Sequence, residues 1–328
     1  MVEQHLTRRA KSLALGLAVL SSVCFGSSGP FAKALIHSGF TPLQAVWLRV
    51  AGAALVLVPL TLALRGVAGF RAAGRGWPSL ALFGVTGVAG CQACYFVAAA
   101  RLPVGVAILL EFTGPVLVVA WIRLVRRAPV ARAAAAGVAV ALAGVACVVQ
   151  VWQGLRLDGI GLLAGLGAAA CQAAYFLVAK RMTAVTDPLV LTSCGFVVGT
   201  VALTAPAAPW SIPWRLLPGE VMLADRPAPA WLVAAWIIVV STVVAYLTSV
   251  LVLRRLSAPV AAAVAYPEAA AAAVFAWIVI GERLSAVQIA GGVVVLVGAF
   301  IAQRAVSAGA APVAAGHGEP APAPVAAG

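Results

Sequence analysis

Apolar runs of about twenty residues, separated by short breaks that carry arginine, most constrain how this chain can fold. A helix that crosses a bilayer needs about 20 predominantly apolar residues. The candidate runs lie at about 12–36, 42–64, 78–100, 103–122, 131–151, 159–179, 188–206, 230–253, 258–280 and 286–303. The sequence therefore predicts an all-α integral membrane protein with ten transmembrane helices.

Composition supports a lipid bilayer as the surroundings of the chain. It is 63% hydrophobic and 9% charged, whereas a soluble domain carries about a quarter charged residues. A net charge of +13 raises the question of nucleic-acid binding. The basic residues lie at the ends of runs rather than in one tract, so no nucleic-acid partner is expected.

The cysteines are expected to act as small hydrophobic residues. All six lie inside apolar runs: Cys24, Cys91, Cys94, Cys147, Cys171 and Cys194. The Cys91-x-x-Cys94 pair has no second pair of ligands, which makes a metal or redox site a weak interpretation. We expect no metal and no cofactor.

Lysine and arginine in the connections predict the orientation. One side holds fifteen of them: Arg8, Arg9, Lys11, Arg65, Arg71, Arg75, Arg123, Arg126, Arg127, Arg132, Lys180, Arg181, Arg254, Arg255 and Arg304. The other side holds five: Arg101, Arg156, Arg215, Arg226 and Arg283. Cytoplasmic loops carry the excess of positive charge. We therefore expect both termini in the cytoplasm of a multi-pass inner (plasma) membrane protein. The first run is too long for a signal peptide and is expected to be an uncleaved span.

The two halves of the chain repeat each other. Motifs that recur at offsets of 146 to 156 are Cys24…Ala32-Lys33 with Cys171…Ala179-Lys180, Pro42-Leu43 with Pro188-Leu189, Pro103-Val104 with Pro259-Val260, and Gly137 and Gly144 with Gly291 and Gly298. Since each half has five spans, the second half enters the membrane from the opposite side, and transporters of this kind bind at the midplane between the halves. We predict inverted five-helix repeats at 12–151 and 159–303. Residues 305–328 are Ala-, Gly- and Pro-rich and are predicted to form a disordered cytoplasmic tail.

Two charged residues lie at similar depth in the first repeat. Glu111 is eight residues into a run that starts outside, about 12 Å deep at 1.5 Å per residue. Arg49 is seven or eight residues into another run that starts outside. We predict that the two pair. The pair is either a fixed structural bridge or a site for a carboxylate, an amine or a proton that opens and closes.

Glu268 has no predicted cation beside it. It lies near the midplane, and the repeat position of Arg49 is Gly195. Low dielectric favours the neutral form of an unpaired carboxyl, which suits an acid that couples transport to protons. The alternatives are a neutral acid bonded to a carbonyl that Pro267 frees, or an acid facing a wet cavity.

Other polar side chains in the spans could meet a solute or hold helices together. The pattern Cys-Gln-Ala-x-Tyr-Phe occurs at 91–96 and again at 171–176. Glutamine and tyrosine can bind an amino-acid head group, but they often join helices instead. The candidates are Gln92, Tyr95, Gln172, Tyr175 and Tyr246.

Two charged positions near the outer ends are assigned no contact with a solute. Lys33 is three or four residues from the outer end of the first span and is expected to snorkel to the surface. Glu282-Arg283 lies in an outer turn with a structural or topological role.

These features resemble the EamA family of the drug/metabolite transporter superfamily over about residues 13–303. The resemblance rests on the ten spans in two copies, the turn Gly281-Glu282-Arg283-Leu284 and the glycine-rich final span. It implies export of small amino acids or similar metabolites in exchange for protons. It also implies that spans one to four and six to nine line a cavity while spans five and ten pack behind.

Within this family the chain looks like the threonine/homoserine exporter branch. The segment Leu110-Glu111-Phe112-Thr113-Gly114-Pro115, followed by Arg126-Arg127 after the span, carries this resemblance. That branch has Glu-Pro in span nine, where this chain reads Tyr266-Pro267-Glu268. The acid is displaced by two positions, roughly 200° around a helix.

Rival functions are a membrane enzyme, an exporter of hydrophobic drug-like solutes, and a channel. Gly26-Ser27-Ser28-Gly29 fits an intramembrane serine-protease pattern, but such a serine needs a base, and no histidine lies in a span core. No span contains aspartate and there is no His-Glu-x-x-His motif, so no catalytic residue is assigned. Repeated halves argue against a channel. The expected partners are a small-molecule substrate, protons and lipid, and the sequence leaves the assembly open, a homodimer included.

Overall fold

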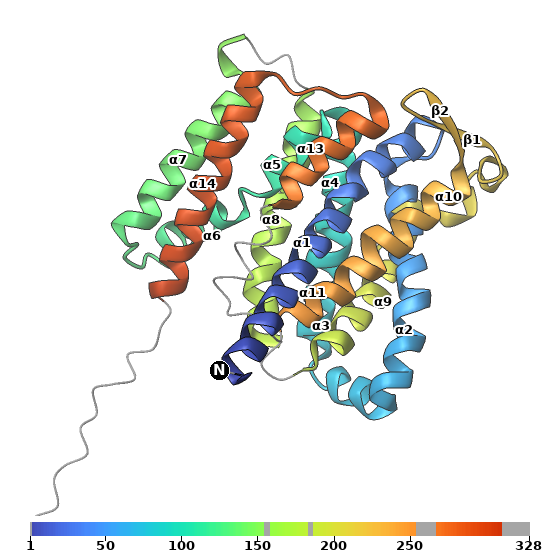
Figure 1. Cartoon of the computed structure of the whole chain (residues 1–328), viewed down its shortest axis with the longest axis horizontal. Coiled ribbons are helices and arrows are strands. Elements are labelled where there is room, and N and C mark those ends of the chain that lie inside the picture. The colour runs from blue at the N-terminus through green and yellow to red at the C-terminus, as the bar shows by residue number, and fades with distance from the viewer. Residues whose placement is uncertain (1, 154–157, 183–185, 254–266, 310–328) are drawn as a thin grey trace, which may run out of the picture.

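The computed structural model describes residues 2–153, 158–182, 186–253 and 267–309, and these are almost entirely helical (Figure 1). In this part of the chain, nine helical segments are long and apolar enough to cross a membrane. Helix α13 (Pro267–Ile280) is also apolar, but its 14 described residues fall short of that length. The nine coincide with nine of the predicted spans, and the start of the remaining one, at 258–266, lies outside the described residues.

The first half contains five spans. Their elements are α1 (Val2–His37), α2 (Pro42–Gly74), α3 (Trp77–Phe83) with the π-helix η1 (Gly84–Gly90) and α4 (Cys91–Arg101), α5 (Val104–Glu111) with α6 (Gly114–Leu124), and α7 (Arg132–Val149). A short 3₁₀ turn, η2 (Val151–Gln153), follows α7.

The second half contains the remaining helical segments together with short 3₁₀ turns and a two-stranded hairpin. They are α8 (Gly159–Met182), α9 (Pro188–Ala207), the 3₁₀ turns η3 (Pro209–Ser211) and η4 (Trp214–Leu216), β1 (Glu220–Leu223), β2 (Arg226–Pro229), α10 (Ala230–Ala235) with the π-helix η5 (Trp236–Val244) and α11 (Ala245–Leu253), then α13 and α14 (Ala286–Gly309). Helix α14 continues to Gly309, so residues 305–309 of the predicted tail are helical, and the rest of that tail, 310–328, lies outside the described residues.

Local signals set where helices begin and bend. Thr41 caps α2 by accepting a hydrogen bond from the Gln44 amide, while the Gln44 side chain accepts one from the Thr41 amide. This reciprocal arrangement satisfies two amides at the start of a helix. Asp187 caps α9 in a similar way through the Leu189 amide. Helix α2 changes direction at Gly66, whose φ of +64° glycine adopts readily.

Three spans are irregular. The third span of each half contains a π-helix, η1 in the first half and η5 in the second. Such segments are rare and frequently mark functional sites. The fourth span breaks at Phe112 and Thr113, between α5 and α6. These interruptions fall where helices must present polar groups inside the membrane.

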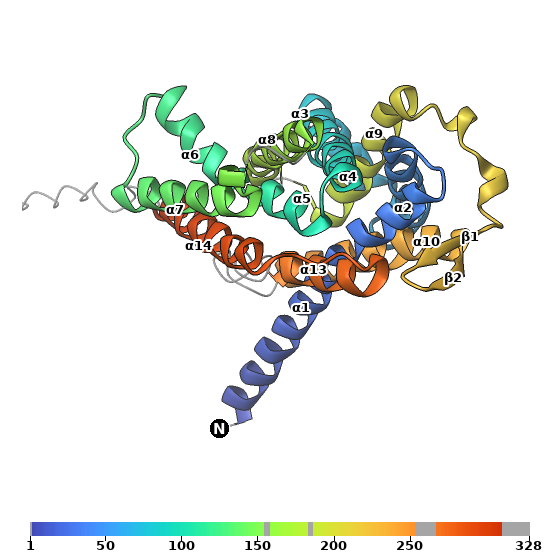
Figure 2. The same cartoon turned by 90° about the horizontal axis from the view of Figure 1, so that it is seen from above.

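Helices α7 and α14 form a close antiparallel pair at one side of the molecule, seen at the left of Figure 1 and again in Figure 2. A Cβ on Gly137 would lie 2.6 Å from the Ala302 amide, and one on Gly144 would lie 2.5 Å from the Val295 amide. Glycine at these positions lets the two backbones approach closely, as small residues do between membrane helices.

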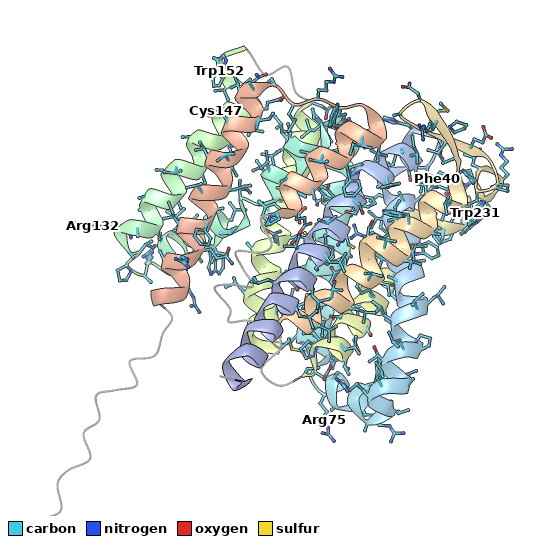
Figure 3. The ribbon with its side chains drawn as sticks, viewed as in Figure 1. Phe40, Arg75, Arg132, Cys147, Trp152 and Trp231 are labelled. Carbon is cyan, nitrogen blue, oxygen red and sulfur yellow. The ribbon has the colours of Figure 1, made fainter. Side chains whose placement is uncertain are left out.

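The long loop predicted at 207–229 contains structure of its own. It holds η3, η4 and a two-stranded antiparallel hairpin in which Glu220 pairs with Pro229 and Leu223 with Arg226. The hairpin lies beside α10 and the end of α1 (Figure 1). Figure 3 labels Phe40, just before α2, and Arg75, just after it, at opposite ends of the molecule. The hairpin lies at the same end as Phe40.

Helix α1 leaves the bundle at its N-terminal end, as Figure 2 shows. Its Leu13 and Val19 are exposed, whereas its later residues Ala32 and Leu35 are fully buried. The second half of α1 is therefore the part that contributes to the interior.

Candidate functional site

A cavity of about 230 Å³ lies among α1, α2, η1, α4, α5, α8, α11 and α13. Its lining residues are Phe25, Ser28, Arg49, Gly87, Cys91, Gln92, Tyr95, Glu111, Phe112, Gln172, Tyr175, Tyr246, Ser249 and Glu268. All eight side chains predicted from the sequence line this one cavity. Spans one to four, six, eight and nine contribute to it. Span seven, α9, contributes none of the lining residues and packs against α2 and η1.

A larger groove of about 460 Å³ lies elsewhere, between α13 and α14. Its walls include the exposed apolar side chains of Val274, Trp277 and Ile289. An exposed apolar wall on a membrane helix faces lipid. We place the functional site in the smaller cavity, where the intramembrane charges gather.

Arg49 is buried and held by one segment of the second half and one of the first. Its Nε donates to Thr242 Oγ1 at 2.8 Å and its Nη2 to the Ser241 carbonyl at 3.3 Å, both in η5. Its Nη1 donates to Gln92 Oε1 at 2.7 Å, directly after η1. The guanidinium carbon lies 5.5 Å from the centre of the Phe96 ring.

These contacts leave part of the guanidinium unused. Arginine has five N–H groups, and described residues accept from three of them. Because Arg49 joins Gln92 to Thr242, it also links the two π-helical regions. A ligand carboxylate bound to the remaining N–H groups would meet a cation already fixed in place.

Glu111 ends α5 and is oriented by neighbouring helices. Its Oε1 accepts from Gln172 Nε2 at 3.1 Å, on α8, and from Cys91 Sγ at 3.4 Å, on α4. Oε2 accepts no hydrogen bond from the described residues and remains available to a solute. Thus both copies of the Cys-Gln-Ala-x-Tyr-Phe pattern reach this carboxyl.

Glu268 lies in the first turn of α13 and is half-buried. Within the described ranges, no side chain or amide hydrogen-bonds its carboxyl. The helix itself is pressed against α1, since a Cβ on Gly26 would lie 2.6 Å from the Glu268 carbonyl. The backbone is therefore fixed, while the carboxyl faces the cavity without a hydrogen-bond partner among the residues that the structure describes.

Tyr95 brings an unsatisfied hydroxyl to the same cavity. This hydroxyl is the one buried side-chain polar atom without a hydrogen-bond partner in the described part of the chain. It lies against Gly29 of α1, where any Cβ would collide with it. A buried polar group of this kind costs free energy unless a ligand or water satisfies it.

Aromatic rings cover much of the rest of the wall. Phe25 and Phe196 both meet Tyr246 edge-on, at centroid distances of 4.9 and 5.0 Å. Tyr175 packs against Phe83 at 5.2 Å. The cavity thus combines apolar walls with a few charged groups, the usual composition of small-molecule sites.

The predicted ion pair between Arg49 and Glu111 is wrong in its details. Both residues line the cavity, but no ion pair joins them; Arg49 bonds to Gln92 and η5, and Glu111 bonds to Cys91 and Gln172. Depth along a helix was similar for the two, but depth does not fix the direction of a side chain around the helix.

The expected snorkelling of Lys33 is also wrong. Its side chain is buried and its Nζ lies 2.6 Å from Glu282 Oε1. Glu282 was predicted to be structural, and this contact agrees with a role outside the cavity. Snorkelling was the expectation because Lys33 is near a span end, and spacing alone could not reveal an acid from another turn.

Sequence reasoning missed several residues that complete the site. Cys91 was treated as a small hydrophobic residue, yet its thiol donates to Glu111. The Ser241 carbonyl accepts a hydrogen bond from Arg49. The lining residues Phe25 and Phe112 are apolar, and no spacing rule separates them from core residues. The signal that could have found Cys91 is its place in the duplicated Cys-Gln-Ala motif.

Comparison with known proteins identifies what the chain is similar to. Residues 12–150 and 159–303 match the EamA-like transporter family. Over 214 residues the chain is 28% identical to the threonine/homoserine exporter RhtA of Salmonella typhimurium, strains SL1344 and LT2. This match covers 63% of the chain and 65% of the length of those relatives.

A solved structure described as "Crystal structure of protein" has the same fold. Its TM-score with this chain is 0.59 at 20% identity, covering 92% of this chain and 99% of that one. The likeness supports the arrangement of helices and carries no information about a solute.

Proposed function

Because the chain belongs to the EamA-like transporter family, we propose that it exports small amino acids, such as threonine or homoserine, in exchange for protons. It is a multi-pass membrane transporter rather than an enzyme. The observation that carries the proposal is the gathering of Arg49, Glu111 and Glu268 on one small cavity.

The polar groups suit the two ends of an amino acid. The free N–H groups of Arg49 would take the carboxylate, because guanidinium–carboxylate bonds are charge-assisted. The ammonium would face Glu111, whose Oε1 is held by Gln172 and Cys91. The unsatisfied hydroxyl of Tyr95 is available to a polar side chain such as that of threonine.

Cavity size favours a small solute. The volume of about 230 Å³ lies below the ~300–1,000 Å³ of pockets that hold drug-sized ligands. An amino acid with a short side chain suits this space better than a bulky drug-like molecule does.

Glu268 is the residue best suited to bind and release the proton that is exchanged. Its carboxyl has no hydrogen-bond donor among the described residues, whereas Glu111 has two, so its charge depends most on what occupies the cavity. In an exchanger, protonation on one side and solute binding on the other would alternate at such a group. We assign it the coupling role that the sequence predicted.

For topology we retain the predicted arrangement: two inverted repeats at 12–151 and 159–303 in the inner membrane, with both termini cytoplasmic. The excess of basic residues on one side supports this orientation. The presence of a π-helix in the third span of each half supports the repeat. The pairing of Gly137 and Gly144 with their counterparts on α14 supports it as well.

A second candidate is export of compact organic cations. Five aromatic side chains line the cavity, namely Phe25, Tyr95, Phe112, Tyr175 and Tyr246. Two carboxyls face one guanidinium there, and aromatic rings attract desolvated cations. This candidate differs from the first because such a solute has no carboxylate for Arg49.

The experiment is counterflow of labelled threonine in liposomes containing the purified protein, with unlabelled competitors. Threonine and homoserine should compete. Threoninol, which lacks the carboxylate, and N-acetylthreonine, which lacks the ammonium, should not. In Arg49→Gln the threonine signal should fall by about 10- to 100-fold, since a hydrogen bond to a charged group is worth about 1.5–3 kcal/mol.

The matched control is Arg65→Gln. Arg65 forms an exposed ion pair with Asp187 at 3.0 Å, away from the cavity, and its loss should leave counterflow unchanged. Threoninol competing as well as threonine would favour the cation exporter. If the protein is folded and no amino acid gives counterflow or competes, the amino-acid proposal is contradicted.

A further inference from the structure

A buried ion pair joins three separate parts of the molecule near one end. Lys33 Nζ lies 2.6 Å from Glu282 Oε1 and also donates to the Leu102 carbonyl at 2.7 Å. Glu282 Oε2 accepts from the Val104 amide at 2.8 Å. We call these four groups the outer latch. It connects α1, the turn between α4 and α5, and the turn between α13 and α14.

The turn that carries Glu282 is shaped to reach α5. Gly281 ends α13 with a φ of +71°, a conformation that favours glycine. Leu284 then packs on Gly105, where a Cβ would lie 2.7 Å from Leu284 Cδ1. A charge and an apolar side chain thus fasten the same turn to the start of α5.

The latch lies next to the cavity. A Cβ on Gly29 would lie 2.8 Å from Val104 Cγ1 and would also collide with the Tyr95 hydroxyl. Tyr95 lines the cavity, and the Val104 amide belongs to the latch. Val104 therefore belongs to the latch through its amide, while its side chain lies against Gly29 beside Tyr95 of the cavity wall.

The opposite end has no counterpart in sequence. The repeat position of Lys33 is Lys180, and the repeat region of Glu282 reads Arg126-Arg127-Ala128. A lysine facing arginine repels rather than binds. At these two repeat positions, an attractive ion pair can therefore form only at the end at which Glu282 lies.

We propose that Lys33 and Glu282 form a gate on the extracellular side, which holds that side shut while the cavity is open to solute from the cytoplasm. The proposal rests on the orientation given under the proposed function. Outward release requires the turn after α13 to part from α1 and α5, which breaks the latch. Since the latch stabilises only the outward-closed state, its loss shifts the population toward the outward-open state.

The native thiol of Cys91 reports the state of the gate, because it lines the cavity. Cells and inverted vesicles containing the full chain are treated with a charged, membrane-impermeant thiol reagent, and modification of Cys91 is followed by mass spectrometry. Cys91→Ala gives the blank. In the unmodified chain we expect faster labelling from the cytoplasmic face than from outside.

Lys33→Met and Glu282→Gln remove the ion pair in different ways. Glu282→Gln keeps an oxygen that can accept from the Val104 amide, so it tests the charge alone. Both should raise labelling from outside by about tenfold or more, the order expected when a charge-assisted hydrogen bond is lost. Arg101→Gln, which removes an exposed pair with Asp158, should leave labelling unchanged.

Unchanged external labelling in both variants would overturn the proposal. Equal gains from both faces would also overturn it, because a merely structural bridge loosens the bundle without regard to side. Labelling needs neither substrate nor a proton gradient. A failure of the gate is therefore distinguishable from a failure of amino-acid exchange.

Discussion

The helices around the cavity and the α7–α14 pair are held together by different kinds of contact. Around the cavity, helices are interrupted by η1, η5 and the break after Glu111, and polar side chains hydrogen-bond across them. The α7–α14 pair is regular, and its contact uses glycines such as Gly137 and Gly298. Both regions lie in one membrane, so the difference cannot come from the surroundings.

The difference indicates which helices move during transport and which keep their positions. Backbone approach at glycines depends on fixed geometry and tolerates little sliding. Hydrogen bonds between side chains can exchange partners when a solute enters. We therefore assign movement to the cavity helices and a supporting role to α7 and α14, and the following changes test that division.

The largest effect is expected from Gly298→Leu. A Cβ at Gly298 collides with the backbone of Ala141, so the two helices must separate. Overpacking of this kind costs about 1–3 kcal/mol, and occasionally more. The thermal unfolding temperature in detergent should fall sharply.

Gly16→Leu is its matched control, because nothing lies within 4 Å of that glycine's Cβ position. The folded fraction of Gly298→Leu should still exchange substrate. Equal stability of the two variants would contradict the idea that close approach holds the pair.

Next in size is Arg49→Lys, which keeps the charge in the cavity. Lysine cannot reproduce the fork that reaches Thr242, Gln92 and the Ser241 carbonyl together. Threonine counterflow should fall by about tenfold or more, the size of a lost charge-assisted bond. Full activity in this variant would mean that only charge matters, and that the link between η1 and η5 does not.

Tyr95→Phe should have a smaller effect, and one that divides stability from affinity. Its hydroxyl is buried without a partner in the described residues, so removing it should leave the unfolding temperature equal or higher. Threonine should bind a few-fold more weakly, by about 0.5–1.5 kcal/mol for one hydrogen bond. A thermal unfolding scan measures the first quantity, the unfolding temperature, and isothermal titration calorimetry measures the second, the affinity for threonine. Equal affinity would show that the hydroxyl does not contact the solute.

The smallest effect is expected at the exposed start of α8. A hydrogen bond from the Gly161 amide, followed by the nearby Arg101 cation, holds the pKa of Asp158 below its usual value of 3.8. Because the pKa is lower in the folded state, the ionised Asp158 side chain stabilises the folded state above pH 3.8. This contribution to the free energy of unfolding disappears as the pH falls through the lowered pKa. Asp158→Asn should therefore lower the unfolding temperature slightly at neutral pH and not at all in strong acid.

Much of the fold and of the cavity could be predicted because membrane burial leaves strong marks in sequence. Hydrophobic length set the spans, and the cost of charge in lipid singled out Arg49, Glu111 and Glu268. Partners could not be predicted in the same way. The bond from Arg49 to Ser241 depends on the π-helical backbone of η5, and no residue pattern in that segment announces it.

The ion pair between Lys33 and Glu282 could not be predicted from the sequence either. Lys33 and Glu282 are far apart in sequence, and only the tertiary structure brings the turn after α13 onto α5. The hairpin of β1 and β2 was also absent from the prediction, since proline at 227 and 229 argues against a strand except at an edge.

The most direct test of amino-acid and proton exchange is proton movement by the purified protein in liposomes when an amino acid is added. It should be measured for the unmodified chain, Glu268→Gln and Glu111→Gln. We predict that threonine or homoserine moves protons through the unmodified chain, and that Glu268→Gln abolishes this while substrate exchange survives. Proton movement in both variants equal to that of the unmodified chain would contradict the assignment and make the two acids structural.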